Sequence, residues 1–184
     1  MSSQRREGST KMLEASVFLG VLDEPDIEWL VANSRREEIP SGSVLIRRGE
    51  PVEFLYLIVD GAFNATVFSP DARHIATLHA GELTGEMSFV DLHPPSATVT
   101  ARMNSSVLAV TKTVLTEKIK SDSGFAARFY EGVSLLLTAR LRAAYGLDIR
   151  PLPEAETKVE MDILERRYEE IQDRLGLRRL AERT

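Results

Sequence analysis

The spacing of apolar positions changes twice along the chain, and each change predicts a different kind of structure. From Lys11 to Asn33 the apolar residues follow the helical spacing of three and four. Between Arg36 and Thr111 they occur in short β-branched or aromatic runs, which turn-forming residues separate. Beyond Val114 the helical spacing returns. The pattern therefore predicts an α+β protein in which a strand-rich region lies between two helical regions.

Short runs in the middle of the chain have the composition of β-strands. They are spaced roughly 8 to 12 residues apart, which is typical of sandwiches and barrels. Residues 85–92 interrupt the series with the pattern of a short helix. The runs that we predict as strands are 44–46, 54–59, 65–68, 75–78, 98–101 and 107–110.

Both helical regions contain signals for the ends of helices. Asp23 can cap a helix whose first turn contains Pro25, because a proline there loses no hydrogen bond. Residues 114–119 and 125–145 predict a short helix and a long helix, and Gly146 is expected to end the long one. Residues 1–10 are polar, and we expect them to form a disordered tail.

The last part of the chain has the pattern of a linker followed by a charged helix. Two prolines in residues 150–153 predict a rigid linker, so that the main domain covers residues 11–149. Residues 154–184 predict an amphipathic helix whose narrow apolar stripe could pair with a second copy, pack on its own domain or dock on another protein. The stripe consists of Met161, Leu164, Tyr168, Ile171 and Leu175.

Composition narrows the classes of function that remain. The net charge of −5 argues against a general binder of nucleic acid or anionic membranes, since such proteins present a basic face. The absence of cysteine excludes disulfides, thiolate chemistry and cysteine-ligated zinc. The three histidines show no spacing typical of a metal site or of a catalytic nucleophile. No apolar run approaches the roughly 20 residues of a membrane span. We therefore expect a cytoplasmic protein without enzymatic activity.

Glycine-punctuated motifs give the clearest indication of the fold. In order along the chain they are Pro40–Ile46 with Gly49-Glu50, then Leu55–Gly61, Gly81–Phe89 and Pro94–Val99. Together they resemble the cyclic-nucleotide-binding domain family, from residue 13 to about residue 145. The resemblance implies an antiparallel β-roll of the double-stranded β-helix, or jelly-roll, type. N-terminal helices and a long C-terminal helix would flank this roll.

The same resemblance implies a binding site around Glu86. A short helix starting near Glu86 would present backbone N–H groups to a cyclic phosphate, and Gly85 would let the backbone approach the ligand closely. Glu86 matches the glutamate of the family that accepts a hydrogen bond from the ribose, although a carboxylate there also suits a helix N-terminus. Ser96 matches a residue that donates to the phosphate, and Met87 and Ala97 complete the candidate site.

One position departs from the family pattern. Pro95 stands where nucleotide-binding members have the arginine that pairs with the phosphate. Proline offers neither a guanidinium nor a backbone N–H group. Because a charge-assisted hydrogen bond contributes about 1.5–3 kcal/mol, and a desolvated ion pair more, we expect binding to be weakened roughly 10- to 1000-fold.

These observations favour a dimeric, non-catalytic regulatory protein with weakened or altered binding of a cyclic nucleotide or related ligand. The alternative is a structural scaffold whose pocket is vestigial. A DNA-binding transcription regulator of this family would need a helix-turn-helix domain after the long helix, and the residues after Pro153 predict one charged helix instead. Neither a membrane nor a nucleic acid is therefore expected as a partner.

Overall fold

The computed structural model describes residues 18–67 and 73–146. These residues divide into two compact units, one within residues 30–126 and the other containing residues 18–29 and 127–146, and each unit is described by itself. The predicted tail, linker and C-terminal helix, with its stripe from Met161 to Leu175, lie outside the described residues.

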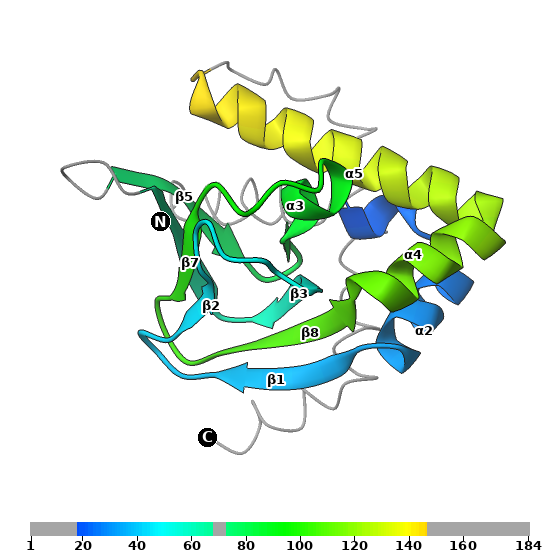
Figure 1. Ribbon diagram of the computed structural model, residues 1–184, viewed down its shortest axis with the longest axis horizontal. Helices are drawn as coiled ribbons and strands as arrows, with labels where there is room; N and C mark the ends of the chain where they lie inside the picture. Colours follow the sequence, from blue (N-terminus) through cyan, green and yellow to red (C-terminus); the bar gives the residue numbers. More distant parts are fainter. Residues whose placement is uncertain (1–17, 68–72, 147–184) are drawn as a thin grey trace, which may run out of the picture. The chain divides into compact units, whose positions relative to one another are not determined.

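The unit of residues 30–126 is a β-roll of two antiparallel four-stranded sheets (Figure 1). One sheet has the order β1-β8-β3-β6 and the other has the order β2-β7-β4-β5. This arrangement confirms the predicted antiparallel roll. The strands are β1 (Arg35–Ile39), β2 (Val44–Ile46), β3 (Phe54–Asp60), β4 (Ala62–Val67), β5 (Arg73–His79), β6 (Leu83–Thr84), β7 (Thr98–Ala101) and β8 (Ser105–Thr111).

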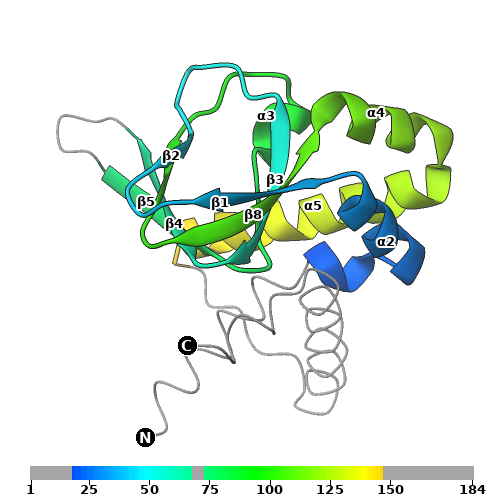
Figure 2. The ribbon, with the colours of Figure 1, turned by 90° about the horizontal axis from the view of Figure 1, so that it is seen from below.

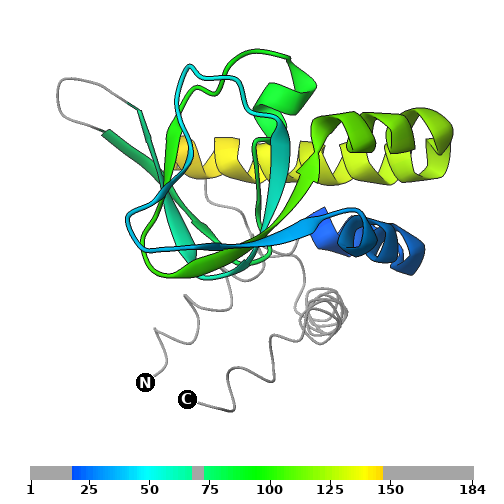
Figure 3. The ribbon, with the colours of Figure 1, turned by 60° about the horizontal axis from the view of Figure 1, so that its bottom comes forward.

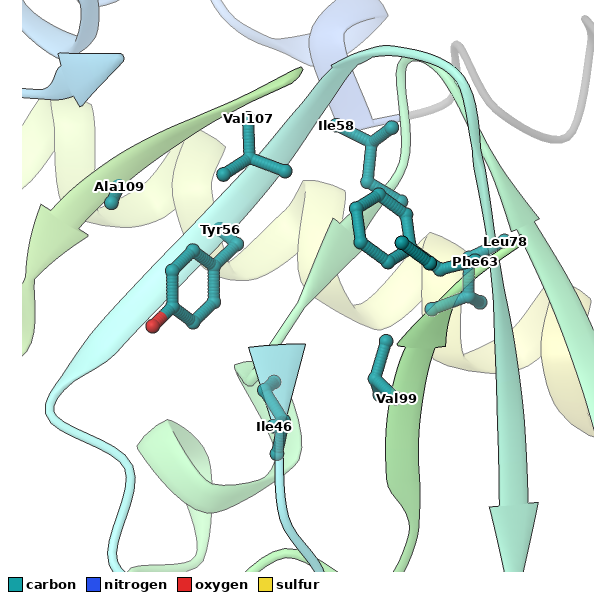
Figure 4. Packing of buried hydrophobic residues seen from close by; sticks show 9 residues of the cluster. Ile46, Tyr56, Ile58, Phe63, Leu78, Val99, Val107 and Ala109 are labelled. Carbon is teal, nitrogen blue, oxygen red and sulfur yellow. The ribbon is translucent and has the colours of Figure 1, made fainter. Parts of the chain in front are cut away.

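The core of the roll lies between the two sheets. Side chains from both sheets meet there, because alternate residues of each strand point to the same face (Figure 4). Phe63 and Ile58 are fully buried, and each apolar side chain of this size contributes about 1.5–3 kcal/mol on burial. The cluster comprises Ile46, Tyr56, Ile58, Phe63, Leu78, Val99, Ala101, Val107 and Ala109.

Strand β1 was not among the predicted strands. Its sequence is Arg-Arg-Glu-Glu-Ile, which lacks the apolar alternation of a half-buried strand. The strand pairs with β8 at the edge of its sheet, and its charges pair with each other. Arg35 lies 2.7 Å from Glu37, and Arg36 lies 2.7 Å from Glu38, since residues two apart share one side of a strand. Opposite charges two residues apart were therefore the signal for this strand.

Two helices of the roll agree with their predictions. Helix α3 (Glu86–Val90) interrupts the strands between β6 and β7. Helix α4 (Lys112–Ser121) follows β8, and the Thr111 side chain caps it by accepting a hydrogen bond from the Val114 N–H group.

The other unit contains helical residues 18–21, most of α2 (Glu24–Ala32) and most of α5 (Ser123–Ala144). Asp23 caps α2 as predicted, because its Oδ1 accepts a hydrogen bond from the Asp26 N–H group at 3.1 Å. The predicted end of the long helix is also confirmed, since α5 stops at Ala144 before Gly146 adopts a φ of 62°.

Aromatic packing and a buried ion pair hold this helical unit together. Phe18 meets Phe129 edge to face, with ring centroids 5.6 Å apart. Arg128 binds both oxygens of Asp26, donating from Nη2 to Oδ1 at 2.9 Å and from Nε to Oδ2. It also reaches Asp23 at 3.0 Å. Asp26 is only 2% exposed, so its charge depends on this guanidinium.

Among the described residues, no helix combines the length and the apolar character that crossing a bilayer requires.

Candidate functional site

The candidate site begins at the turn between β6 and α3. Gly85 is the N-cap residue of α3 and has φ 90° and ψ −1°, a left-handed conformation that favours glycine. A Cβ atom at this position would lie 2.9 Å from the carbonyl oxygen of Phe54. Because glycine has no side chain, none caps the first N–H groups of α3. The turn therefore has the sharp glycine bend that the sequence predicted, while the predicted approach to a ligand stays a prediction.

The residues on either side of this turn are unusually buried for their polarity. Glu86 is 3% exposed, and Thr84 is 5% exposed beside Tyr56 in the strand register. Glu82 is also buried, and its Oε1 accepts a hydrogen bond from the His79 N–H group at 3.0 Å. Buried carboxylates are costly unless partners or a ligand compensate them. Met87, by contrast, is half exposed.

The segment that closes the site runs from Asp91 to Ala97 and is mostly exposed. Ser96 is exposed and Ala97 is half-buried, immediately before β7. Pro95 is buried, and its carbonyl oxygen accepts a hydrogen bond from the Gly49 N–H group at 2.9 Å. Position 95 is therefore covered by the protein, and proline supplies no charge or backbone N–H group there.

The loop after β2 links the two halves of the site. Gly85 lies beside Ile46 and Phe54, and Gly49 bonds to Pro95, so residues 46–54 contact both the turn and the closing segment. The Arg48 N–H group adds a hydrogen bond to Thr98 Oγ1 at 3.2 Å. Figures 2 and 3 show this loop and the segment after α3 running next to each other at one end of the roll.

Two ionisable side chains of the closing segment lie beside each other. His93 is 80% exposed and pairs with Asp91 at 3.5 Å, so it lies in solvent. Burial lowers the pKa of Lys112, and the nearby carboxylate of Asp91 raises it in part. No cluster of three metal-ligating side chains occurs among the described residues.

The described residues around the turn combine a glycine bend with buried carboxylates. Backbone N–H groups at the start of α3 and the Glu86 carboxylate are groups that can form hydrogen bonds with a ligand. Position 95 carries no charge, because it is a proline. Two features were missed at the sequence level: the Asp26–Arg128 pair, whose members are 102 residues apart, and a cleft beside Tyr56. Neither leaves a signal in local spacing.

Comparison with known proteins agrees with this geometry. A family model described as the cyclic nucleotide-binding domain matches residues 36–122. The chain is 37% identical over 81 residues to a cyclic nucleotide-gated potassium channel of Rhizobium etli, a match covering 44% of this chain and 22% of the channel. It is 29% identical over 70 residues to a cAMP-activated global transcriptional regulator of Salmonella typhimurium, covering 37% of this chain and 33% of the regulator. The chain thus spans a third or less of these curated relatives.

A solved structure shows the same fold over most of its length. A cyclic nucleotide-binding domain from Methylobacillus flagellatus superimposes with a TM-score of 0.65 and covers 78% of this chain and 88% of its own, at 22% identity. This likeness concerns the fold, while the match of residues 36–122 concerns the sequence. Residues 36–122 therefore match the cyclic nucleotide-binding domain family in sequence, and the fold of the chain agrees with that match.

Proposed function

We propose that this protein is a non-catalytic regulatory protein whose roll binds a cyclic nucleotide or a related ligand. The affinity is weakened because no arginine pairs with the phosphate. One observation carries the proposal: Gly85 forms a left-handed turn before the buried Glu86, whereas the buried position 95 is a proline. The relatives named above are channels and transcription regulators, which supports a regulatory role. The candidate contacts are Gly85, Glu86, Met87, Ser96 and Ala97.

Restoring the missing cation tests the proposal directly. Calorimetric titration of the wild type with cAMP and cGMP is compared with that of Pro95→Arg. The arginine should raise the affinity roughly 10- to 1000-fold, because it adds a charge-assisted hydrogen bond inside the site. Pro94→Arg is the matched control, since Pro94 is exposed and the added charge is the same. That variant should change the affinity by no more than about fivefold.

Failure of this experiment would favour the alternative function. If Pro95→Arg binds neither nucleotide more tightly than wild type, the site has changed beyond one residue, and a structural scaffold with a vestigial pocket becomes the better account. If the wild type already binds as tightly as Pro95→Arg, the weakening that we infer from proline is wrong.

Dimerisation is the second part of the proposal. The C-terminal half of α5 and the turn after it expose Leu141 and Tyr145, which are 58% and 73% exposed. With Tyr130, which is 43% exposed, they share one side of the helix, because 11 and 4 residues are close to whole turns. Such a row supports pairing with a second copy, to which the 161–175 stripe could add.

A charged residue in this row tests the dimer. Leu141→Lys should shift the mass measured by light scattering from dimer to monomer, because a lysine would be buried at the interface. Leu135→Lys is the matched control, since Leu135 is 43% exposed on another side of α5. A dimeric mass for Leu141→Lys, or a monomeric mass for the wild type, would remove this part of the proposal.

A further inference from the structure

The roll has a hollow that lies outside the candidate nucleotide site. It is a cleft of about 340 Å³ between the end of β2, the following loop and the start of β3. This volume is at the lower end of the range for small-ligand sites, roughly 300–1,000 Å³. Gly85, Glu86, Pro95 and Ser96 do not line it. Its side chains include Leu45, Arg47, Glu50, Glu53, Phe54 and Tyr56.

Tyr56 supplies a polar group to this cleft. The residue is 7% exposed, and Figure 4 shows its hydroxyl at the end of the ring that points away from Phe63 and Leu78. Its hydroxyl makes no hydrogen bond to the described residues. The ring is buried, whereas the hydroxyl oxygen keeps some contact with solvent in the cleft. The hydroxyl is therefore available to a ligand in the cleft.

The aromatic side of the cleft already binds a cation. The guanidinium of Arg35 lies over the ring of Phe54, with its carbon 4.4 Å from the ring centroid. Phe54 in turn lies beside Tyr56, with centroids 6.0 Å apart. Aromatic faces attract cations because of their negative quadrupole. Arg35 thus occupies one face of Phe54, so a positively charged group in the cleft would meet the Tyr56 ring and the rest of Phe54.

The charges at the rim favour the same kind of ligand. Arg47 pairs with Glu50 at 3.3 Å, whereas the exposed carboxylate of Glu53 makes no ion pair with the described residues. Burial raises the pKa of Tyr56, and so do the carboxylates of Glu37 and Glu53. Arg35 opposes this effect. The tyrosine thus stays a neutral hydroxyl, which can accept a hydrogen bond from a cationic N–H group.

We propose that this cleft binds an organic cation, an alkylguanidinium or alkylammonium group, between Tyr56, Phe54 and Glu53. The carboxylate of Glu53 balances the charge of the cationic head, and an N–H group of this head donates a hydrogen bond to the Tyr56 hydroxyl. The alkyl part of the ligand lies against Leu45 and Val52. The cation is either a free small molecule or the side chain of an arginine or lysine in another protein, since both present the same chemistry.

The cleft shares its loop with the nucleotide site. Phe54 lines the cleft, and its carbonyl oxygen is the atom that a Cβ on Gly85 would meet. The loop that carries Arg47 and Glu50 is held to Pro95 through the Gly49 N–H group. A cation in the cleft therefore contacts the same segment that supports both halves of the nucleotide site.

Calorimetric titration of the full chain with butylguanidinium tests this proposal, with butylurea as its neutral isostere. We expect saturable binding of butylguanidinium with a Kd of roughly 1 mM or below, and binding of butylurea at least about fivefold weaker. A capped tripeptide with a central arginine, compared with its citrulline analogue, shows whether the site also accepts a protein side chain. Binding of the arginine peptide identifies a protein partner as a possible source, and binding of butylguanidinium alone identifies a small molecule.

Charge-changing variants should move the affinity in opposite directions. Glu53→Gln should weaken binding of butylguanidinium about two- to fivefold, since the carboxylate is exposed and screened. Arg47→Gln should strengthen binding of butylguanidinium by a similar factor, because the substitution removes a competing cation and releases Glu50.

Tyr56→Phe should weaken binding of butylguanidinium about tenfold, since the lost hydrogen bond is charge-assisted. Glu117→Gln, an exposed glutamate on α4, is the matched control and should change it by less than about twofold.

Several outcomes would overturn the proposal. They are the absence of saturable binding, equal binding of butylurea, and a reversed sign for Glu53→Gln and Arg47→Gln, which would indicate an anion. An effect of Glu53→Gln no larger than that of Glu117→Gln would also overturn it. Glu53 and Arg47 are exposed, so these variants test the site even if Tyr56→Phe unfolds.

Discussion

Asp26 and Glu86 are both buried carboxylates in the first turn of a helix, 2% and 3% exposed, yet their surroundings differ. Asp26 lies in the helical unit, where Asp23 caps the same turn and Arg128 binds both carboxylate oxygens. Glu86 lies in the roll, after a glycine that provides no side-chain cap. The first carboxylate is part of a completed structural contact. The second follows a left-handed turn that has no Cβ and lies close to the Phe54 carbonyl oxygen.

The largest expected effect is that of Asp26→Asn. It should lower the free energy of unfolding by about 3 kcal/mol, because it leaves the guanidinium of Arg128 without its buried counter-charge. Urea unfolding at neutral pH measures this loss. Asp23→Asn is the matched control and should cost less than about 1 kcal/mol, since asparagine also caps helices. Equal losses for the two variants would show that Asp26 acts only as a capping residue.

Gly85→Ala should have the next largest effect, about 2 kcal/mol of unfolding free energy. The new Cβ would require a left-handed backbone and would lie 2.9 Å from a carbonyl oxygen that cannot move aside easily. Gly42→Ala separates the two causes, because Gly42 has φ 81° but nothing within 4 Å of its Cβ position. It should cost about 1 kcal/mol. If both alanines cost the same by thermal unfolding, the turn at Gly85 is not closely packed.

Acid should destabilise the protein partly through Asp26. Burial raises the pKa of Asp26, but hydrogen bonds from Arg128 and Asp23 outweigh it and hold the pKa below its ordinary value of 3.8. A carboxyl with a lowered folded pKa contributes stability above its unfolded pKa, and this is lost as pH falls through the folded value. Unfolding free energies measured from pH 6 downward should therefore decline more steeply below about pH 4 in wild type than in Asp26→Asn. Parallel curves would contradict this.

Glu86→Gln should have the smallest effect on stability, under about 1 kcal/mol, since glutamine keeps the shape of the side chain and can still form hydrogen bonds. In the Pro95→Arg background it should nevertheless lower the affinity for cAMP about tenfold, because the ribose loses a charged acceptor. Calorimetry measures the affinity and urea unfolding the stability. A large loss of stability without a loss of affinity would make Glu86 structural, like Asp26, and would remove the contrast between them.

Much of the roll and of the candidate site could be predicted because local patterns encode them. Strands β2 and β7 have the predicted bounds, and β3 and β8 differ from theirs by only one or two residues at an end. The short helix α3 and the left-handed turn at Gly85 follow from residues adjacent in sequence. Strand β1 was missed because its residues are charged, and its place at a sheet edge depends on β8, about 70 residues later.

The sequence by itself determined the order of elements, the turn at Gly85 and the absence of an arginine at position 95. These features depend on backbone preferences and residue identity, which do not need distant partners. Only the tertiary structure decided that position 95 is buried, that Asp26 forms an ion pair with Arg128, and that Tyr56 lines a cleft. The reason is that burial and pairing depend on which distant segments pack together. The same alternation of residues along a strand fits many such partners.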